Sequence, residues 1–141
     1  MNMKYNIVLL LLCVICTYNE ALLSQTDQIE AAKLCANQTG IAPKSIAKLT
    51  RKLSVPKKDP AVKFFLVCVY KYVGLQDQNG DMNFQKIREQ LKNDFFKYDT
   101  DTIVDNCSSV KGNTHEDNAY LVTQCLLKQI RKLSKSNKNK D

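Results

Sequence analysis

The chain has 141 residues, and its 21 basic residues outnumber its 14 acidic ones, which gives a net charge of +7. This length forms one domain with a real hydrophobic core. The charge does not indicate nucleic-acid binding, because basic residues interleaved with aromatic ones over a folded face are absent. A single histidine and the lack of a catalytic motif argue against an enzyme.

An apolar run at the N-terminus predicts a secretory signal peptide. Lys4 precedes the run 7–16, and polar residues begin at Tyr18. The run is too short to anchor the chain in a membrane. We expect a signal over residues 1–21, cleaved somewhere between 16 and 24, and a secreted, extracellular mature protein. Cys13 and Cys16 leave with this signal.

The four remaining cysteines are Cys35, Cys68, Cys107 and Cys125. An even number in a secreted chain predicts two disulfides, with three connectivities to choose from. A zinc site is weakly supported, because no close cysteine pair remains and the chain has one histidine. We therefore expect no metal and no cofactor.

Two amphipathic helices are predicted first. The segment 26–40 opens on a capping residue, ends at a glycine, and carries an inward stripe of Ile29, Ala32, Leu34 and Cys35. After Pro43, the segment 45–53 repeats apolar residues at positions 46, 49 and 53, which indicates a second short helix.

The stretch 59–75 is predicted to be the central helix of the core. Between Ala61 and Val73 only Lys63 and Lys71 are charged, so the segment is apolar on all sides, yet it is shorter than the roughly 20 residues that cross a bilayer. Asp59 is placed to cap it, Pro60 to occupy its first position and Gly74 to end it.

The faces of this helix have different expected roles. Phe64 and Cys68 lie four residues apart and share one face, whereas Leu66, Tyr70 and Val73 share a roughly opposite face. If Cys68 is tied to a neighbouring helix, the second face is free to line a cavity.

The loop 76–83 has some character of a calcium-binding loop. An EF-hand loop needs glycine at its sixth position and glutamate at its twelfth. Counted from Asp77 as the first position, these places hold Met82 and Arg88. A polar turn is therefore predicted.

Three further helices complete the chain. The fourth carries Phe84, Ile87 and Leu91, the fifth is capped at 99 or 100 and ended by Gly112, and the sixth is capped near Thr114. With no strand pattern, the prediction is an all-α domain of about six helices over residues 22–133. A polar, Lys-rich tail follows at 134–141.

Three polar residues were weighed as sites. His115 is expected to be a surface residue, with pH sensing as the alternative. Asn37 and Asn106 begin glycosylation tripeptides. Each lies close to a disulfide cysteine on a packed helix, so we expect both to remain unmodified.

The cysteine spacing, with 32, 38 and 17 residues between successive cysteines, resembles the insect odorant-binding protein family of the PBP/GOBP type. That family pairs six cysteines first to third, second to fifth and fourth to sixth. Phe64 stands at the second position and Glu116 at the fifth, so both partners of one disulfide are absent. This joint absence resembles the four-cysteine "minus-C" subgroup.

The resemblance implies a compact six-helix fold around an internal apolar cavity, with Cys35 paired to Cys68 and Cys107 to Cys125. It implies a secreted carrier of small apolar ligands such as odorants or pheromones, a monomer or weak dimer, with a membrane chemoreceptor as a further partner. Phe64 is expected to fill the place of the lost sulfur as a buried ring. Tyr70 or Tyr120 is expected to offer a hydroxyl to the ligand. The residues expected to line the cavity are Leu66, Tyr70, Val73, Met82, Ile87, Leu91, Val104, Val122 and Leu126.

One alternative function belongs to a different class. A cationic secreted helical protein acts at membrane surfaces when its basic residues meet anionic lipid. Against this alternative, the last helix is not strongly basic on one face before Lys128.

Overall fold

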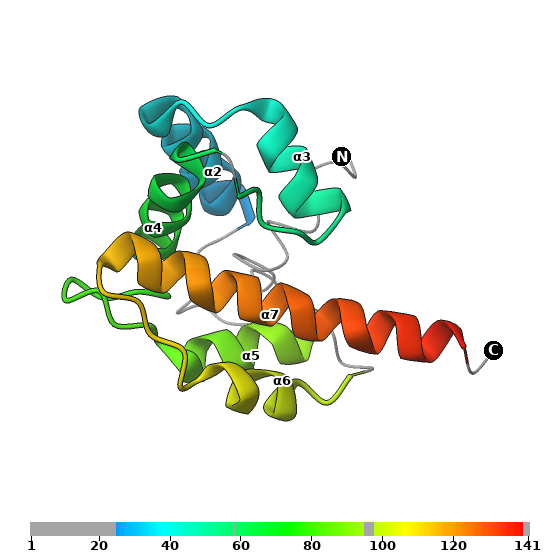
Figure 1. Ribbon diagram of the computed structural model, residues 1–141. Helices are drawn as coiled ribbons and strands as arrows, with labels where there is room; N and C mark the ends of the chain where they lie inside the picture. The colour runs from blue at the N-terminus through cyan, green and yellow to red at the C-terminus, as the bar shows by residue number, and fades with distance from the viewer. Residues whose placement is uncertain (1–24, 58, 95–97, 140–141) are drawn as a thin grey trace.

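The computed structural model describes residues 25–57, 59–94 and 98–139 (Figure 1). The predicted signal peptide, with Cys13 and Cys16, lies outside the described residues. Within them the chain forms six α-helices and no strand, apart from an isolated bridge between Gln76 and Met82. The predicted all-α class is confirmed. The helices are α2 (Gln25–Thr39), α3 (Pro43–Arg51), α4 (Ala61–Val73), α5 (Phe84–Asp94), α6 (Thr100–Cys107) and α7 (His115–Lys138).

The long helix α7 crosses the middle of the molecule in Figure 1, with α2, α3 and α4 above it and α5 and α6 below. It packs against α4 on one side and α6 on the other, while α2 packs against α4 and α5 against α6. Its last turns extend past the other helices in this view. The interior therefore lies around α4 and α7.

Helix α4 is the buried central helix that its apolar composition predicts. Its interior residues include Phe65, Leu66 and Val69, each at most 1% exposed. Pro60 is the residue before the helix rather than its first position, and Asp59 Oδ1 accepts a hydrogen bond from Ala61 N at 3.0 Å. Gly74 ends the helix in the left-handed conformation at φ 80°.

Two expected core residues are exposed instead. Phe64 is 54% exposed, so the expectation of a buried ring in place of the lost sulfur was wrong. Its face of α4, shared with Cys68 and Tyr72, is the outer one, because the neighbouring helices cover the side of Phe65 and Leu66. Leu34 is 45% exposed, because the inner face of α2 carries Ala31 and Cys35, which are fully buried.

Three helix ends differ from the sequence-based boundaries. Helix α3 ends at Arg51, and Leu53 beyond it has a left-handed φ of 48°. Helix α6 ends at Cys107 rather than at Gly112, because the intervening serines and glycine are poor helix formers. Helix α7 runs on to Lys138, through much of the predicted tail. The lysines of its last turn stabilise this end, because positive charges interact favourably with the negative end of the helix dipole.

Candidate functional site

The interior between α4, α5, α6 and α7 contains all nine residues expected to line a cavity. Eight of them are buried, from 0% exposed at Val104 to 8% at Val73, and Met82 packs against them partly buried. They belong to one apolar cluster contributed by four helices and the loop before α5. The structure therefore brings these residues together.

Tyr70 places a polar group inside this apolar cluster. Its hydroxyl donates to Thr123 Oγ1, and Thr123 Oγ1 in turn donates to the carbonyl oxygen of Ala119 at 2.7 Å. Tyr120, the other tyrosine considered, is half-buried, and Lys63 Nζ lies 5.1 Å from the centre of its ring. Of the two, only Tyr70 has its hydroxyl in the core.

Gln90 is an interior polar residue that the sequence reasoning missed. It is 4% exposed, and its Oε1 is buried without a hydrogen-bond partner. It follows Ile87 by three residues and precedes Leu91, so it shares the inward face of α5. A glutamine inside an inward helical stripe is the signal that could have identified it.

The loop before α5 is closed by hydrogen bonds. Asp77 Oδ1 accepts from the backbone nitrogens of Asn79 and Asp81 at 2.8 and 2.9 Å, so this carboxylate stabilises a turn. Gln76 Nε2 donates to the carbonyl oxygens of Gly80 and His115 at 2.8 and 2.9 Å. Among the described residues, no group of His, Cys, Asp or Glu side chains could hold a metal ion.

His115 is more tightly packed than the surface position expected for it. Its Nδ1 lies 2.8 Å from Lys71 Nζ, which donates to it as an ammonium group. The ring also lies against Gly80, where an added Cβ would collide with it. His115 therefore joins α4, the loop and the start of α7.

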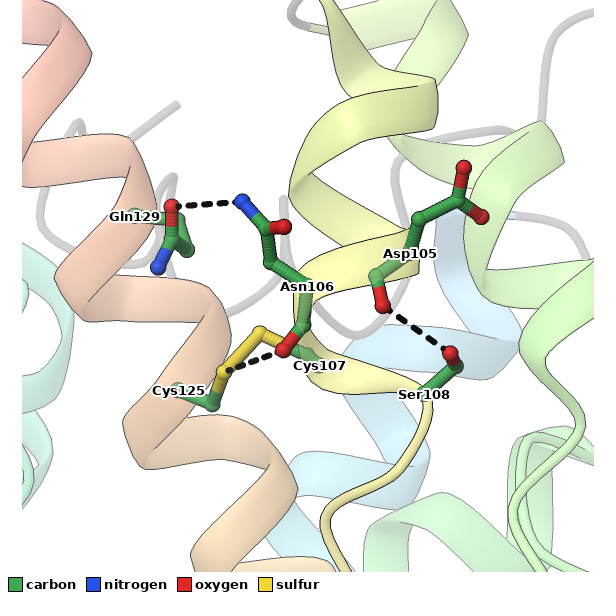
Figure 2. Close-up of a disulfide and its surroundings, with 6 residues drawn as sticks. All are labelled: Asp105, Asn106, Cys107, Ser108, Cys125 and Gln129. Atoms are coloured by element: carbon green, nitrogen blue, oxygen red, sulfur yellow. Dashed lines mark hydrogen bonds between the residues drawn. A yellow bond between two sulfur atoms is a disulfide. The ribbon is translucent and has the colours of Figure 1, made fainter.

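The two disulfides pair Cys35 with Cys68 and Cys107 with Cys125. The first joins α2 to α4, and the second joins α6 to α7 (Figure 2). Beside the second, Asn106 Nδ2, the atom that would carry a glycan, donates to Gln129 Oε1 at 3.4 Å. Ser108 Oγ donates to the carbonyl oxygen of Asp105 at 3.0 Å.

Two half-open hollows lie elsewhere, one near α3 and one near the middle of α7, and none of the nine interior residues lines either. In the described part of the chain, no helix is both long enough and apolar enough to cross a membrane.

Comparisons with known proteins agree with this arrangement. A profile of the PBP/GOBP family matches residues 20–129. The chain is similar to general odorant-binding protein 69a of Drosophila melanogaster, with 31% identity over 93 residues, 66% of this chain and 62% of that protein's length. It is similar to B2 protein of Tenebrio molitor, with 31% identity over 97 residues, 67% of this chain and 72% of that protein.

The fold is similar to that of the odorant-binding protein dmelOBP28a from Drosophila melanogaster. The TM-score is 0.64 at 22% identity, covering 77% of this chain and 93% of the other.

Proposed function

Because the chain belongs to the PBP/GOBP family, the insect odorant-binding proteins, we propose that it is a secreted carrier that reversibly binds small hydrophobic ligands in its interior. The observation that carries the proposal is the apolar cluster at the junction of four helices, which contains all nine expected lining residues. Apolar walls favour an apolar ligand, because each Å² of apolar ligand surface removed from water contributes about 25 cal/mol of favourable binding free energy.

The ligand's polar group is the next part of the proposal. The Oε1 atom of Gln90 is a buried acceptor without a partner, and such an atom costs about 1–3 kcal/mol. A ligand that brings a hydroxyl to this oxygen recovers that cost, whereas a hydrocarbon of the same length does not. Gln90 therefore favours alcohols of the odorant or pheromone type over alkanes.

Assignment to the minus-C subgroup is also proposed. Phe64 and Glu116 stand where six-cysteine relatives have their second and fifth cysteines, and the residues beside them, Lys63 and Asp117, form an ion pair of 2.6 Å. Helices α4 and α7 thus meet close to the position of the absent disulfide. Cys13 and Cys16 do not alter this assignment if the predicted signal peptide over residues 1–21 is removed.

We propose that the carrier domain covers residues 22–133 and that it performs no chemistry on its ligand. The one histidine is engaged by Lys71 rather than beside a nucleophile. A membrane chemoreceptor is the proposed recipient of the ligand, and a monomer or weak dimer the proposed state. Membership of the family does not favour the membrane-active alternative, and a carrier should leave anionic vesicles intact at low salt.

Displacement of a fluorescent probe from the secreted protein tests the carrier function. A panel of alkanols and alkanes matched in length should displace the probe, with alkanols the tighter ligands. Gln90→Leu should lower the affinity for alkanols relative to alkanes by about tenfold, which corresponds to about 1.4 kcal/mol. Gln85→Leu, at an exposed position of the same helix, is the matched control and should keep it.

The outcomes separate the two parts of the proposal. If no apolar compound displaces the probe, the carrier function is wrong. If alkanes and alkanols bind equally well to the unmodified protein, only the role of Gln90 is wrong.

A further inference from the structure

The two surface hollows adjoin each other, and basic residues line both. The first, of about 940 Å³, lies along α3 and the connector to α4, and the second, of about 710 Å³, lies between that connector and α7. Both are lined by Ser54, Val55 and Lys57, so they adjoin each other at the connector. We call the two adjoining hollows the basic trough. Its cations are Lys44, Lys48, Arg51, Lys52, Lys57, Lys128, Arg131 and Lys132.

The trough concentrates the positive charge of the molecule. Its eight cations face one lining carboxylate, Asp59, a surplus of seven that equals the net charge of the whole chain, +7. Asp59 is occupied, because its oxygens accept from Ser45 Oγ at 2.7 Å and from Ala61 N at 3.0 Å. The hydrogen bond from Ser45 lowers the pKa of Asp59.

The trough cations, in contrast, are not neutralised by carboxylates of the described residues. None of the eight forms an ion pair with a carboxylate in the described part of the chain, and seven are exposed. Lys44 and Lys48 lie four residues apart on α3, and Lys52, the residue that caps its C-terminus, follows after four more; like charges at this spacing repel. This repulsion between lysines does not stabilise the fold. An anionic partner bound in the trough would neutralise their positive charge and remove the repulsion.

The shape of the trough favours an elongated partner. Helices α3 and α7 both contribute to its walls, and Arg131 Nη1 of α7 donates to the carbonyl oxygen of Leu53, in the connector after α3, at 2.7 Å. The hydrogen bond therefore fixes the backbone at Leu53, the residue with the left-handed φ. Two adjoining hollows, one lined by α3 and the other by α7, can hold successive anionic groups of a linear chain, whereas a flat bilayer contacts only their rims.

We propose that the basic trough binds a linear polyanion of the sulfated-polysaccharide class. Sulfated polysaccharides belong to the extracellular space, so this choice of polyanion assumes the proposed secretion of the chain. Binding to a polyanion releases condensed counterions, and the affinity should therefore fall steeply with salt. The trough lies apart from the nine interior residues, so it is a second site that does not depend on the carrier function.

Titration of fluorescently labelled heparin with the secreted protein tests the proposal. We expect binding at about 50 mM salt that weakens progressively towards 200 mM. Lys48→Glu with Arg51→Glu on α3 should reduce the affinity at least tenfold and flatten the salt dependence. Lys128→Glu with Lys132→Glu on α7 should do the same, because both helices line the trough. Circular dichroism should show unchanged folding, since these four side chains are exposed.

A control of equal charge separates a site from general attraction. Lys33→Glu with Lys111→Glu reverses two exposed lysines that line neither hollow and should change the affinity less than threefold. An equal loss in this control would overturn the proposal. So would a loss in only one of the two trough variants. Preferential binding to phosphatidylserine vesicles over heparin, at equal anionic charge, would replace the polysaccharide by a lipid surface.

Discussion

Lys63 on α4 and Asp117 in the first turn of α7 form an ion pair of 2.6 Å, and each is the chain neighbour of Phe64 or Glu116. The hydrogen bond between them raises the pKa of Lys63 and lowers the pKa of Asp117. Both side chains are partly exposed, at 42% and 34%, so solvent screens the pair. A noncovalent contact thus joins α4 and α7 beside the two positions at which we propose that a disulfide is absent.

The Asp117 carboxylate should make stability depend on acid. Because its pKa is lower in the folded state, its contribution is present above the unfolded value of about 3.9 and is lost as the pH falls through the folded value. Asp117→Asn should therefore lower the melting temperature at pH 7, and the difference from the unmodified protein should shrink towards pH 3. Asp81→Asn is the control, and a difference that does not change with pH would contradict this assignment.

A third disulfide should form in the variant Phe64→Cys with Glu116→Cys. Bridging requires Cα atoms within about 7 Å, and the ion pair between the adjacent residues holds the two helices together there. Because the Phe64 ring is exposed, its removal leaves no core cavity, so the melting temperature should rise. Thiol titration should find no free thiols. Binding of bulky ligands should weaken, since the interior can no longer widen.

The matched control for this variant is Phe64→Ser with Glu116→Ser, which makes the same truncations without a crosslink. Two free thiols that persist under oxidising conditions would show that the alignment of the missing cysteines is wrong.

Deleting Ser134–Asp141 should leave ligand affinity nearly unchanged. The last fully buried residue of α7 is Ile130, and the residues described from Lys135 to Asn139 are exposed. Probe affinity should therefore stay within about threefold, which is less than 1 kcal/mol. A tenfold loss would instead mean that these residues cover the bound ligand.

Gly80→Ala should destabilise the protein more than Gly40→Ala. Both glycines have positive φ, at 86° and 69°, so alanine is strained at either position by about 1–2 kcal/mol. Only at Gly80 does the added methyl group collide with the His115 ring, whereas nothing lies within 4 Å at Gly40. Melting temperatures give the comparison. Adding His115→Ala to Gly80→Ala should recover part of the loss, and equal effects at the two glycines would rule out the packing role of His115.

The periodicity of apolar residues predicted the helices, but it did not predict which side chains the neighbouring helices would cover. The all-round apolar character of α4 identified the central helix, and the resemblance to the family supplied the cysteine pairing that spacing alone left open. The orientation of Phe64 could not be predicted, because a helical face becomes inner or outer only through the neighbours that cover it. The contact between His115 and Lys71 depends on the crossing of α4 and α7, which local sequence does not encode.

The basic trough also could not be predicted from the sequence, because its residues come from segments far apart in the chain. Lys48 and Lys132 lie in segments that the sequence treats as a short helix and the approach to a tail. They line one surface only because the connector after α3 packs beside α7, with Arg131 bonded to Leu53. A charge pattern becomes a surface only when the fold brings distant segments together.

The two disulfides crosslink two pairs of helices, α2 with α4 and α6 with α7. The seam between these pairs is the contact of α4 with α7, and it is held by side-chain packing and single polar contacts rather than by a sulfur bridge in the described chain. Residues of both helices, such as Tyr70 and Val122, also belong to the proposed ligand-binding interior. A substitution that loosens this seam therefore shifts unfolding and ligand release together, so the two properties cannot be tuned separately at these positions.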